Sequence, residues 1–201
     1  MIYLIHLAGL FPLLRWVWLT ALGGLGANPP EFIIRSSGLW ALVALCLTLC
    51  ITPLRKVLHW PSVLRWRRPL GLYAFFYTLL HVLAWAWWEQ NASLAAMLQD
   101  ILQRPFIAVG VAGTVPLCFM ALTSTRGWMR RLGPNWQRLH RLIYPIALLS
   151  VLHFWLIRAG KNDFFEPYVY GVVVVLLLAW RVWDAGRRRA MRNLQKSARS
   201  A

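Results

Sequence analysis

Long runs of apolar residues alternate with short polar segments along this chain. Each apolar run is about 18 residues or longer, which is the length that an α-helix needs to cross the hydrocarbon core of a bilayer. Segments rich in glycine, proline or arginine separate the runs, among them GGLGANPP, RRP and GP. The pattern predicts an all-α, polytopic membrane protein, a bundle of six transmembrane helices. We place the helices at about 2–20, 38–55, 69–89, 105–123, 139–157 and 167–184.

Composition supports one transmembrane domain and leaves no room for a soluble one. Hydrophobic residues make up 59% of the 201 residues, and charged residues only 14%. We expect a single domain over residues 1–185 and a basic cytoplasmic tail over residues 186–201. The first apolar run lacks the basic start and the cleavage site of a signal peptide, so we expect it to be retained as a helix.

The net charge of +16 is sorted along the chain rather than spread over it. Most of the 22 Lys and Arg residues lie after the second and fourth apolar runs and in the tail. Short loops with an excess of Lys and Arg remain on the cytoplasmic side of a membrane. Both termini are therefore predicted to be cytoplasmic, and we expect the lipid bilayer rather than nucleic acid to be the partner of this charge. The opposite side carries only Arg35, Arg104, Arg158 and Lys161.

Two histidines lie deep within apolar runs. His81 and His153 follow the cytoplasmic starts of spans three and five by about 18 and 21 Å, at a rise of 1.5 Å per residue. Ionisable side chains at such depth are costly and indicate function. Neutral imidazole is a natural ligand of haem iron, and facing helices of a bundle build cofactor sites. We predict that His81 and His153 hold one haem iron; the alternative is that each hydrogen-bonds a neighbouring helix or lines a polar cavity.

His140 lies on the same span as His153, at its cytoplasmic mouth. On an ideal helix the two side chains point about 140° apart, and Pro145 between them can kink the axis. This favours two sites at two depths, with His140 either a ligand of the more cytoplasmic one or an ordinary interfacial residue. Arg67 and Arg68 lie just before span three. They are candidates for contacts with haem propionates, and it is equally possible that they are ordinary basic residues of a cytoplasmic loop.

Other functions fit the sequence less well than electron transfer. A proton-coupled transporter could use the histidines as a relay, but such relays usually include intramembrane carboxylates, and here Glu89 and Asp184 lie at span ends. A passive membrane anchor would not need histidines at matched depth. No nucleotide-binding glycine motif, Walker motif or zinc-spaced cysteine pair is present. We expect no catalytic residue in this chain.

Six stretches carry a resemblance to a known family: HLAGLFPLLRWVW, GGLGANP, LCITPLR, RWRRPLGLYAFFYTLLH, RPFIAVG and LTSTRGWMRRLGPNWQRLHRLIYPIALLSVLHF. In this order, and with His81, His140 and His153 in place, they resemble the MsrQ (YedZ) family of haem-binding membrane subunits, a branch of the ferric-reductase-like transmembrane domains. The resemblance covers nearly the whole chain except the tail. In IIRSSG the chain departs from the pattern, since Arg35 stands where relatives often have histidine.

The resemblance implies a b-type cytochrome of the bacterial inner membrane, with one or two haem b groups whose ligands map onto His81, His140 and His153. Electrons from the quinone pool would pass through it to a periplasmic molybdopterin reductase of the MsrP type, which repairs methionine sulfoxide in oxidised periplasmic proteins. The chain itself would be a non-catalytic electron-transfer subunit of that oxidoreductase system. FMN is also attributed to the family, and the donor would be membrane quinol or a separate cytosolic flavin reductase. The alternative is a ferric-reductase-like haem carrier with another acceptor.

Overall fold

Helices form all of the regular structure in the computed structural model, which describes residues 2–160 and 162–200; those residues contain no strand. Within this described part of the chain, six helical segments are long and apolar enough to cross a membrane, by length and composition. The predicted six-span, all-α membrane protein is thereby confirmed. The spanning segments are Tyr3–Ala21, Pro29–Val57, Pro61–Glu89, Pro105–Leu122, Pro134–Ala159 and Phe165–Gln195.

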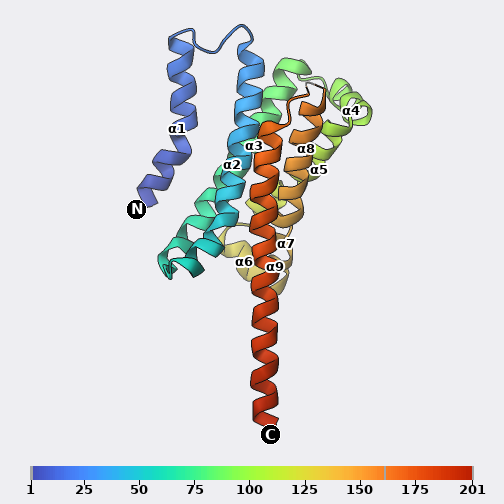
Figure 1. Ribbon diagram of the computed structural model, residues 1–201. Helices are drawn as coiled ribbons and strands as arrows, with labels where there is room; N and C mark the ends of the chain where they lie inside the picture. The colour runs from blue at the N-terminus through green and yellow to red at the C-terminus, as the bar shows by residue number, and fades with distance from the viewer. Residues whose placement is uncertain (1, 161, 201) are drawn as a thin grey trace.

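The helices form a bundle in which one member stands apart (Figure 1). α2 packs chiefly on α3 and α5 chiefly on α8, whereas α1 makes few contacts and lies to one side. Short helices close the two ends: η1, α6 and α7 lie at one, and the π-helical turn η2 and α4 at the other. The bounds are α1 Ile2–Ala21, α2 Pro29–Val57, η1 Pro61–Trp66, α3 Arg67–Ala84, η2 Trp85–Glu89, α4 Leu94–Gln103, α5 Pro105–Leu122, α6 Arg126–Leu132, α7 Pro134–His140, α8 Ile143–Ala159 and α9 Phe165–Ser200.

The second span begins nearer the N-terminus than the apolar pattern predicts. α2 starts at Pro29, where the apolar run alone predicts a start near 38. The Asn28 side chain caps it by accepting a hydrogen bond from the backbone N–H of Glu31 at 3.3 Å. Proline in the first turn costs little, because the N–H groups it removes have no partner within the helix. The added turns bring Ile34 and Arg35 into the bundle as helical residues.

The fifth span is interrupted where the sequence places a proline. α7 ends at His140 and α8 begins at Ile143, with a turn between them. Pro145 lies in the first turn of α8 and has no N–H to offer the carbonyl of Arg141, which instead accepts from Tyr144 N–H at 3.1 Å. His140 and His153 therefore belong to separate helices.

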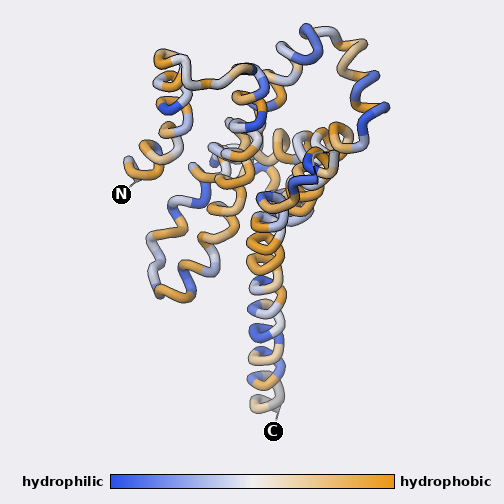
Figure 2. The backbone as a smooth tube through the Cα atoms, turned by 45° about the horizontal axis from the view of Figure 1, so that its top comes forward, coloured by the Kyte–Doolittle hydropathy of each residue, from blue (hydrophilic) through white to orange (hydrophobic). Residues whose placement is uncertain are grey.

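The last helix continues beyond the bundle into the basic tail. α9 runs on to Ser200 and projects from the other helices (Figure 1), and hydrophilic residues become frequent along this projecting part (Figure 2). Near the point of exit, Asp184 pairs with Lys56 of α2 and, at 2.6 Å, with Arg188. The pair with Lys56 connects α9 to the end of α2 that is opposite α4, whereas the pair with Arg188 lies within α9.

Candidate functional site

His81 of α3 and His153 of α8 face each other inside the bundle. Their ring centroids lie 6.0 Å apart, and the ring planes are nearly perpendicular, at 86°. A metal ion held by both imidazoles needs a centroid separation of about 6 Å, from two metal–nitrogen bonds of about 2 Å and about 1 Å within each ring. The rings are thus already spaced for one metal ion between them.

Both rings are oriented by backbone carbonyls of neighbouring helices. Nδ1 of His81 lies 2.8 Å from the carbonyl oxygen of Ile34 in α2, and Nδ1 of His153 lies 2.6 Å from that of Phe106 in α5. A carbonyl can only accept, so each Nδ1 carries the hydrogen and donates it. In a neutral ring this leaves the lone pair on Nε2, which is the usual state of a metal-bound histidine. Both Nε2 atoms are therefore available as ligands.

Two glycines give the rings the space that they occupy. A Cβ atom at Gly38 of α2 would lie 3.1 Å from Nδ1 of His81, and one at Gly110 of α5 would lie 2.9 Å from Nδ1 and Cε1 of His153. Real Cβ atoms essentially never approach a neighbour closer than 3.0 Å. Each histidine ring thus lies against one neighbouring helix, where it contacts a backbone carbonyl and, one turn later, a glycine.

The two halves of the site repeat each other. In each half the carbonyl precedes its histidine by 47 residues. The shift in residue number that carries His81 onto His153 also carries Gly38 onto Gly110 and Thr78 onto Ser150. Thr78 and Ser150 both donate to the carbonyl one turn earlier, at 2.8 and 2.9 Å. The α2–α3 pair and the α5–α8 pair therefore build the same histidine support twice.

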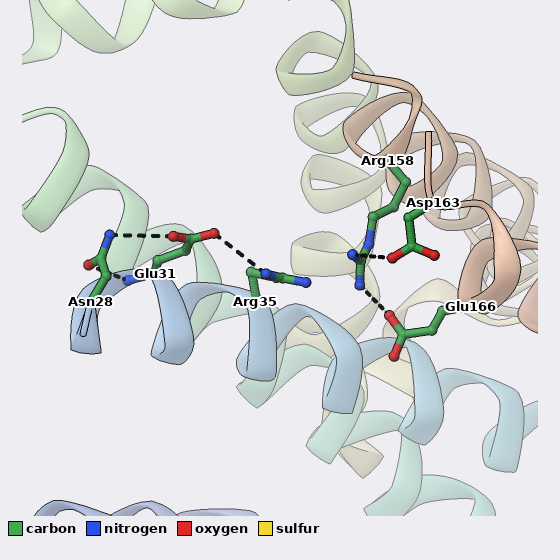
Figure 3. A network of polar contacts seen from close by, with 6 residues as sticks. All are labelled: Asn28, Glu31, Arg35, Arg158, Asp163 and Glu166. Atoms are coloured by element: carbon green, nitrogen blue, oxygen red, sulfur yellow. Dashed lines mark hydrogen bonds and ion pairs between the residues drawn. The ribbon is translucent and has the colours of Figure 1, made fainter. Parts of the chain in front are cut away.

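A large cavity surrounds the histidine pair. Its volume is about 1370 Å³, more than the roughly 300–1,000 Å³ of common small-molecule pockets. Its wall is largely apolar near the histidines and becomes charged toward the end that carries α4. Figure 3 shows part of this charged rim: Arg35 pairs with Glu31 at 3.5 Å, while Arg158 pairs with Asp163 at 2.7 Å and with Glu166.

The donor set matches an iron porphyrin better than a bare metal ion. Among the described residues, no three His, Cys, Asp or Glu side chains are close enough to hold a metal ion between them. A porphyrin supplies four nitrogen ligands of its own and asks the protein only for axial ones. Two opposed neutral imidazoles in an apolar cavity of this size fit that requirement.

The other predicted site residues lie away from this pair. His140 stacks on Trp136, with ring centroids 3.9 Å apart, and its Nδ1 lies 3.0 Å from the Trp136 carbonyl oxygen. It is not among the described side chains that line the cavity. Arg67 and Arg68 begin α3, about 20 Å along the helix from His81. The residue-number shift that carries His81 onto His153 carries Arg68 onto His140. The first half therefore has an arginine where the second half has His140.

Known proteins are similar to this chain over most of its length. Residues 37–151 match the family described as ferric reductase like transmembrane component. A Bordetella pertussis protein named protein-methionine-sulfoxide reductase heme-binding subunit MsrQ is 54% identical over 186 residues, covering 92% of this chain and 90% of the relative. Proteins of the same name are 46% identical in Herminiimonas arsenicoxydans, covering 94% and 88%, and 48% identical in Xanthomonas axonopodis pv. citri, covering 90% and 84%.

Proposed function

Because this chain belongs to the MsrQ family, within the ferric-reductase-like transmembrane proteins, we propose that it is the haem-binding subunit of a methionine sulfoxide reductase system. Its role is to carry electrons across the bacterial inner membrane to a separate catalytic subunit. The observation that supports this most strongly is the pair of opposed histidines, His81 and His153, with ring centroids 6.0 Å apart.

The residues around this pair have the roles that an electron carrier needs. Haem b, when held by the two Nε2 atoms, supplies one-electron transfer through ferric and ferrous iron. The carbonyls of Ile34 and Phe106 hold the hydrogen on Nδ1 of each ring and fix the orientation of both rings. If His81 and His153 both ligated the iron, no position would be left open for a small substrate, which would favour electron transfer at this site.

The location of the pair supports delivery to the periplasmic side. His81 and His153 lie toward the end of the bundle that carries α4, opposite the arginine-rich end that the charge pattern places in the cytoplasm. A periplasmic catalytic subunit of the MsrP type would accept the electrons there. Reduction of one methionine sulfoxide takes two electrons and two protons and gives methionine and water, so two single-electron deliveries complete each turnover.

The opposite end of the bundle is the place for electron entry. His140 lies there, and we propose that it holds or assists a second, cytoplasmic-side haem, with Arg67 and Arg68 as its candidate propionate contacts. Membrane quinol, or a separate cytosolic flavin reductase, would supply the electrons at this end.

Reoxidation by the partner tests the proposed function directly. The purified protein is reduced with dithionite, freed of reductant, and mixed without oxygen with the periplasmic catalytic subunit and methionine sulfoxide. We expect the Soret band to return to its ferric position at a rate that rises with the partner's concentration. The exposed His59 offers a matched control, since His59→Ala should reoxidise like the wild type. A colourless, fully folded protein, or a ferrous band that the partner leaves unchanged, would contradict the proposal.

A further inference from the structure

One buried hydrogen-bond donor in the cavity wall has no partner. Among the described residues, the indole Nε1 of Trp85 is the only buried side-chain nitrogen or oxygen atom without one. Buried donors are almost always paired, because an unpaired one loses its bond to water and gains nothing in exchange. Trp85 lines the same cavity as His81 and follows it by one helical turn. Its natural partner is therefore an acceptor on whatever fills the cavity.

The local backbone gives Trp85 a different environment from its neighbours. It opens the π-helical turn η2, in which the N–H of Gln90 bonds to the Trp85 carbonyl at 3.2 Å, five residues back. Single π-turns inside helices are frequent at functional sites. In the same turn Trp87 is 69% exposed and does not line the cavity. The tryptophans of this turn thus divide between the cavity and the outside.

Packing alone does not require an indole at this position. The shift that carries His81 onto His153 carries Trp85 onto Ile157, which also lines the cavity. Isoleucine fills the equivalent place in the second half without any donor. The N–H of Trp85 is thus a feature of one half only, although the two halves otherwise support their histidines in the same way.

The chemistry of the occupant identifies the acceptor. Around its edge a haem b is apolar except for two propionates, so a carboxylate is the only strong acceptor that it offers to a side chain in the wall. The residues that follow His81 and His153 lie toward the charged end of the cavity. Four arginines and three glutamates line the wall there: Arg15, Arg35, Arg104, Arg158, Glu31, Glu89 and Glu166. The guanidinium groups among them can donate charge-assisted hydrogen bonds to a propionate at this end, and the rest of the described wall offers it no comparable donors.

We propose that the indole N–H of Trp85 donates a hydrogen bond to a propionate of the haem held between His81 and His153. This inference rests on the proposed function and adds to it the orientation of the haem, with its propionates toward the α4 end. The bond also adjusts the reduction potential, because a donor draws negative charge away from the carboxylate and so lowers the electron density near the iron.

Redox titration of single variants in the full-length haem-loaded protein tests this bond. Trp85→Phe keeps an aromatic ring and removes the donor, so the midpoint potential of this haem should shift to a lower value while the low-spin signal of two imidazole ligands remains. Trp87→Phe, in the same turn, should leave the potential unchanged. An unchanged potential in W85F, with the haem bound, would overturn the proposal without affecting the proposed function.

Two further measurements keep the test decisive if W85F binds haem poorly. Trp85→Gln retains an N–H donor in a smaller and less similar shape, and should bind haem better than W85F. Equal loss in the two variants would show that only the size of the indole matters. Reconstitution with haem dimethyl ester removes the anionic acceptor, so W85F and the wild type should then have nearly equal potentials. A difference as large as with ordinary haem would contradict the propionate bond.

Discussion

At the scale of single residues, the direction of each imidazole is set by groups on the neighbouring helix. His153 donates to the carbonyl of Phe106, and Gly110 one turn later lets the ring lie against the backbone of α5. The same arrangement holds His81 against Ile34 and Gly38. A buried histidine without these contacts could adopt other rotamers and the other tautomer. The glycines are therefore as much a part of the site as the histidines.

A methyl group at Gly110 should displace the His153 ring. Its Cβ would lie 2.9 Å from two ring atoms, so Gly110→Ala should weaken haem binding by about 10- to 100-fold, as is usual for changes to groups that orient a metal ligand. Gly38→Ala, at 3.1 Å from His81, should have a smaller effect in the same direction. Haem titration of the apoprotein, followed by the Soret band, measures both.

Gly113→Ala is the matched control for this series. It lies one turn further along α5, where a Cβ would meet only Leu149 at 3.7 Å, an ordinary contact. Its haem affinity should equal that of the wild type. Equal losses in G110A and G113A would mean that the helix tolerates no added side chain anywhere, and that the contact with the ring is not special.

The histidines could be found from the sequence, whereas their supports could not. An imidazole in the middle of an apolar run is conspicuous because of its cost there, so depth alone singles out His81 and His153. The supporting acceptors are backbone carbonyls, which every residue carries, and so no side chain marks them. The one available signal was the equal spacing from Gly38 to His81 and from Gly110 to His153, which becomes meaningful only when α2 is known to pair with α3 and α5 with α8.

At the scale of helices, α1 is attached to the bundle through a few specific contacts with α2 and α3. Tyr77 of α3, only 1% exposed, donates to the carbonyl of Gly9, and Trp16 donates to Ser36 Oγ of α2 at 2.9 Å. The rings of Trp16 and Tyr77 also meet edge to face, 5.9 Å apart. These contacts matter because the rest of α1 makes few others with the bundle.

Removal of the Tyr77 hydroxyl should loosen this attachment. We expect Tyr77→Phe to lower the free energy of unfolding by about 0.5–1.5 kcal/mol, the usual net value of one hydrogen bond. Thermal unfolding of the haem-loaded protein in detergent, followed by near-UV circular dichroism, measures this. Tyr3→Phe is the control, since Tyr3 lies on α1, the helix that Tyr77 contacts, with 79% of its surface exposed. Equal melting temperatures for Y77F and the wild type would contradict this role of the hydroxyl.

Helix boundaries show where the apolar pattern fails as a guide. The pattern locates a span by its lipid-facing residues, but a helix begins where its first N–H groups can be satisfied. Asn28, Pro29 and Pro30 form such a start. In a sequence, however, asparagine followed by two prolines is also typical of a loop. Proline alone does not predict an interruption either: the fifth span is broken just before Pro145, whereas Pro12, Pro53 and Pro116 lie inside continuous helices.

At the scale of the whole molecule, the charge distribution and the site define two ends. The histidine pair and the charged rim of the cavity lie at the α4 end, whereas most arginines lie at the other end and along the projecting part of α9. A carrier that delivers electrons to the periplasm needs this polarity. The predicted orientation is therefore a property of the entire chain, because it depends on where Lys and Arg occur along it.

Reporter fusions test this orientation. Alkaline phosphatase, which is active only in the periplasm, should be inactive when fused after the last residue and active when inserted after Gly160. Green fluorescent protein, which matures only in the cytoplasm, should fluoresce at the C-terminus. The reverse pattern would place the histidine pair near the cytoplasm and would contradict delivery to a periplasmic partner.

Low-temperature EPR of the ferric protein tests the central claim, that His81 and His153 bind one iron together. We expect a low-spin signal of bis-imidazole iron that both His81→Ala and His153→Ala convert to the same high-spin signal. The double variant should add little, since the two residues act as one unit. His140→Ala should leave this signal in place. A shared iron would be contradicted if the two single variants altered different signals, or if H140A removed the signal that H81A removes.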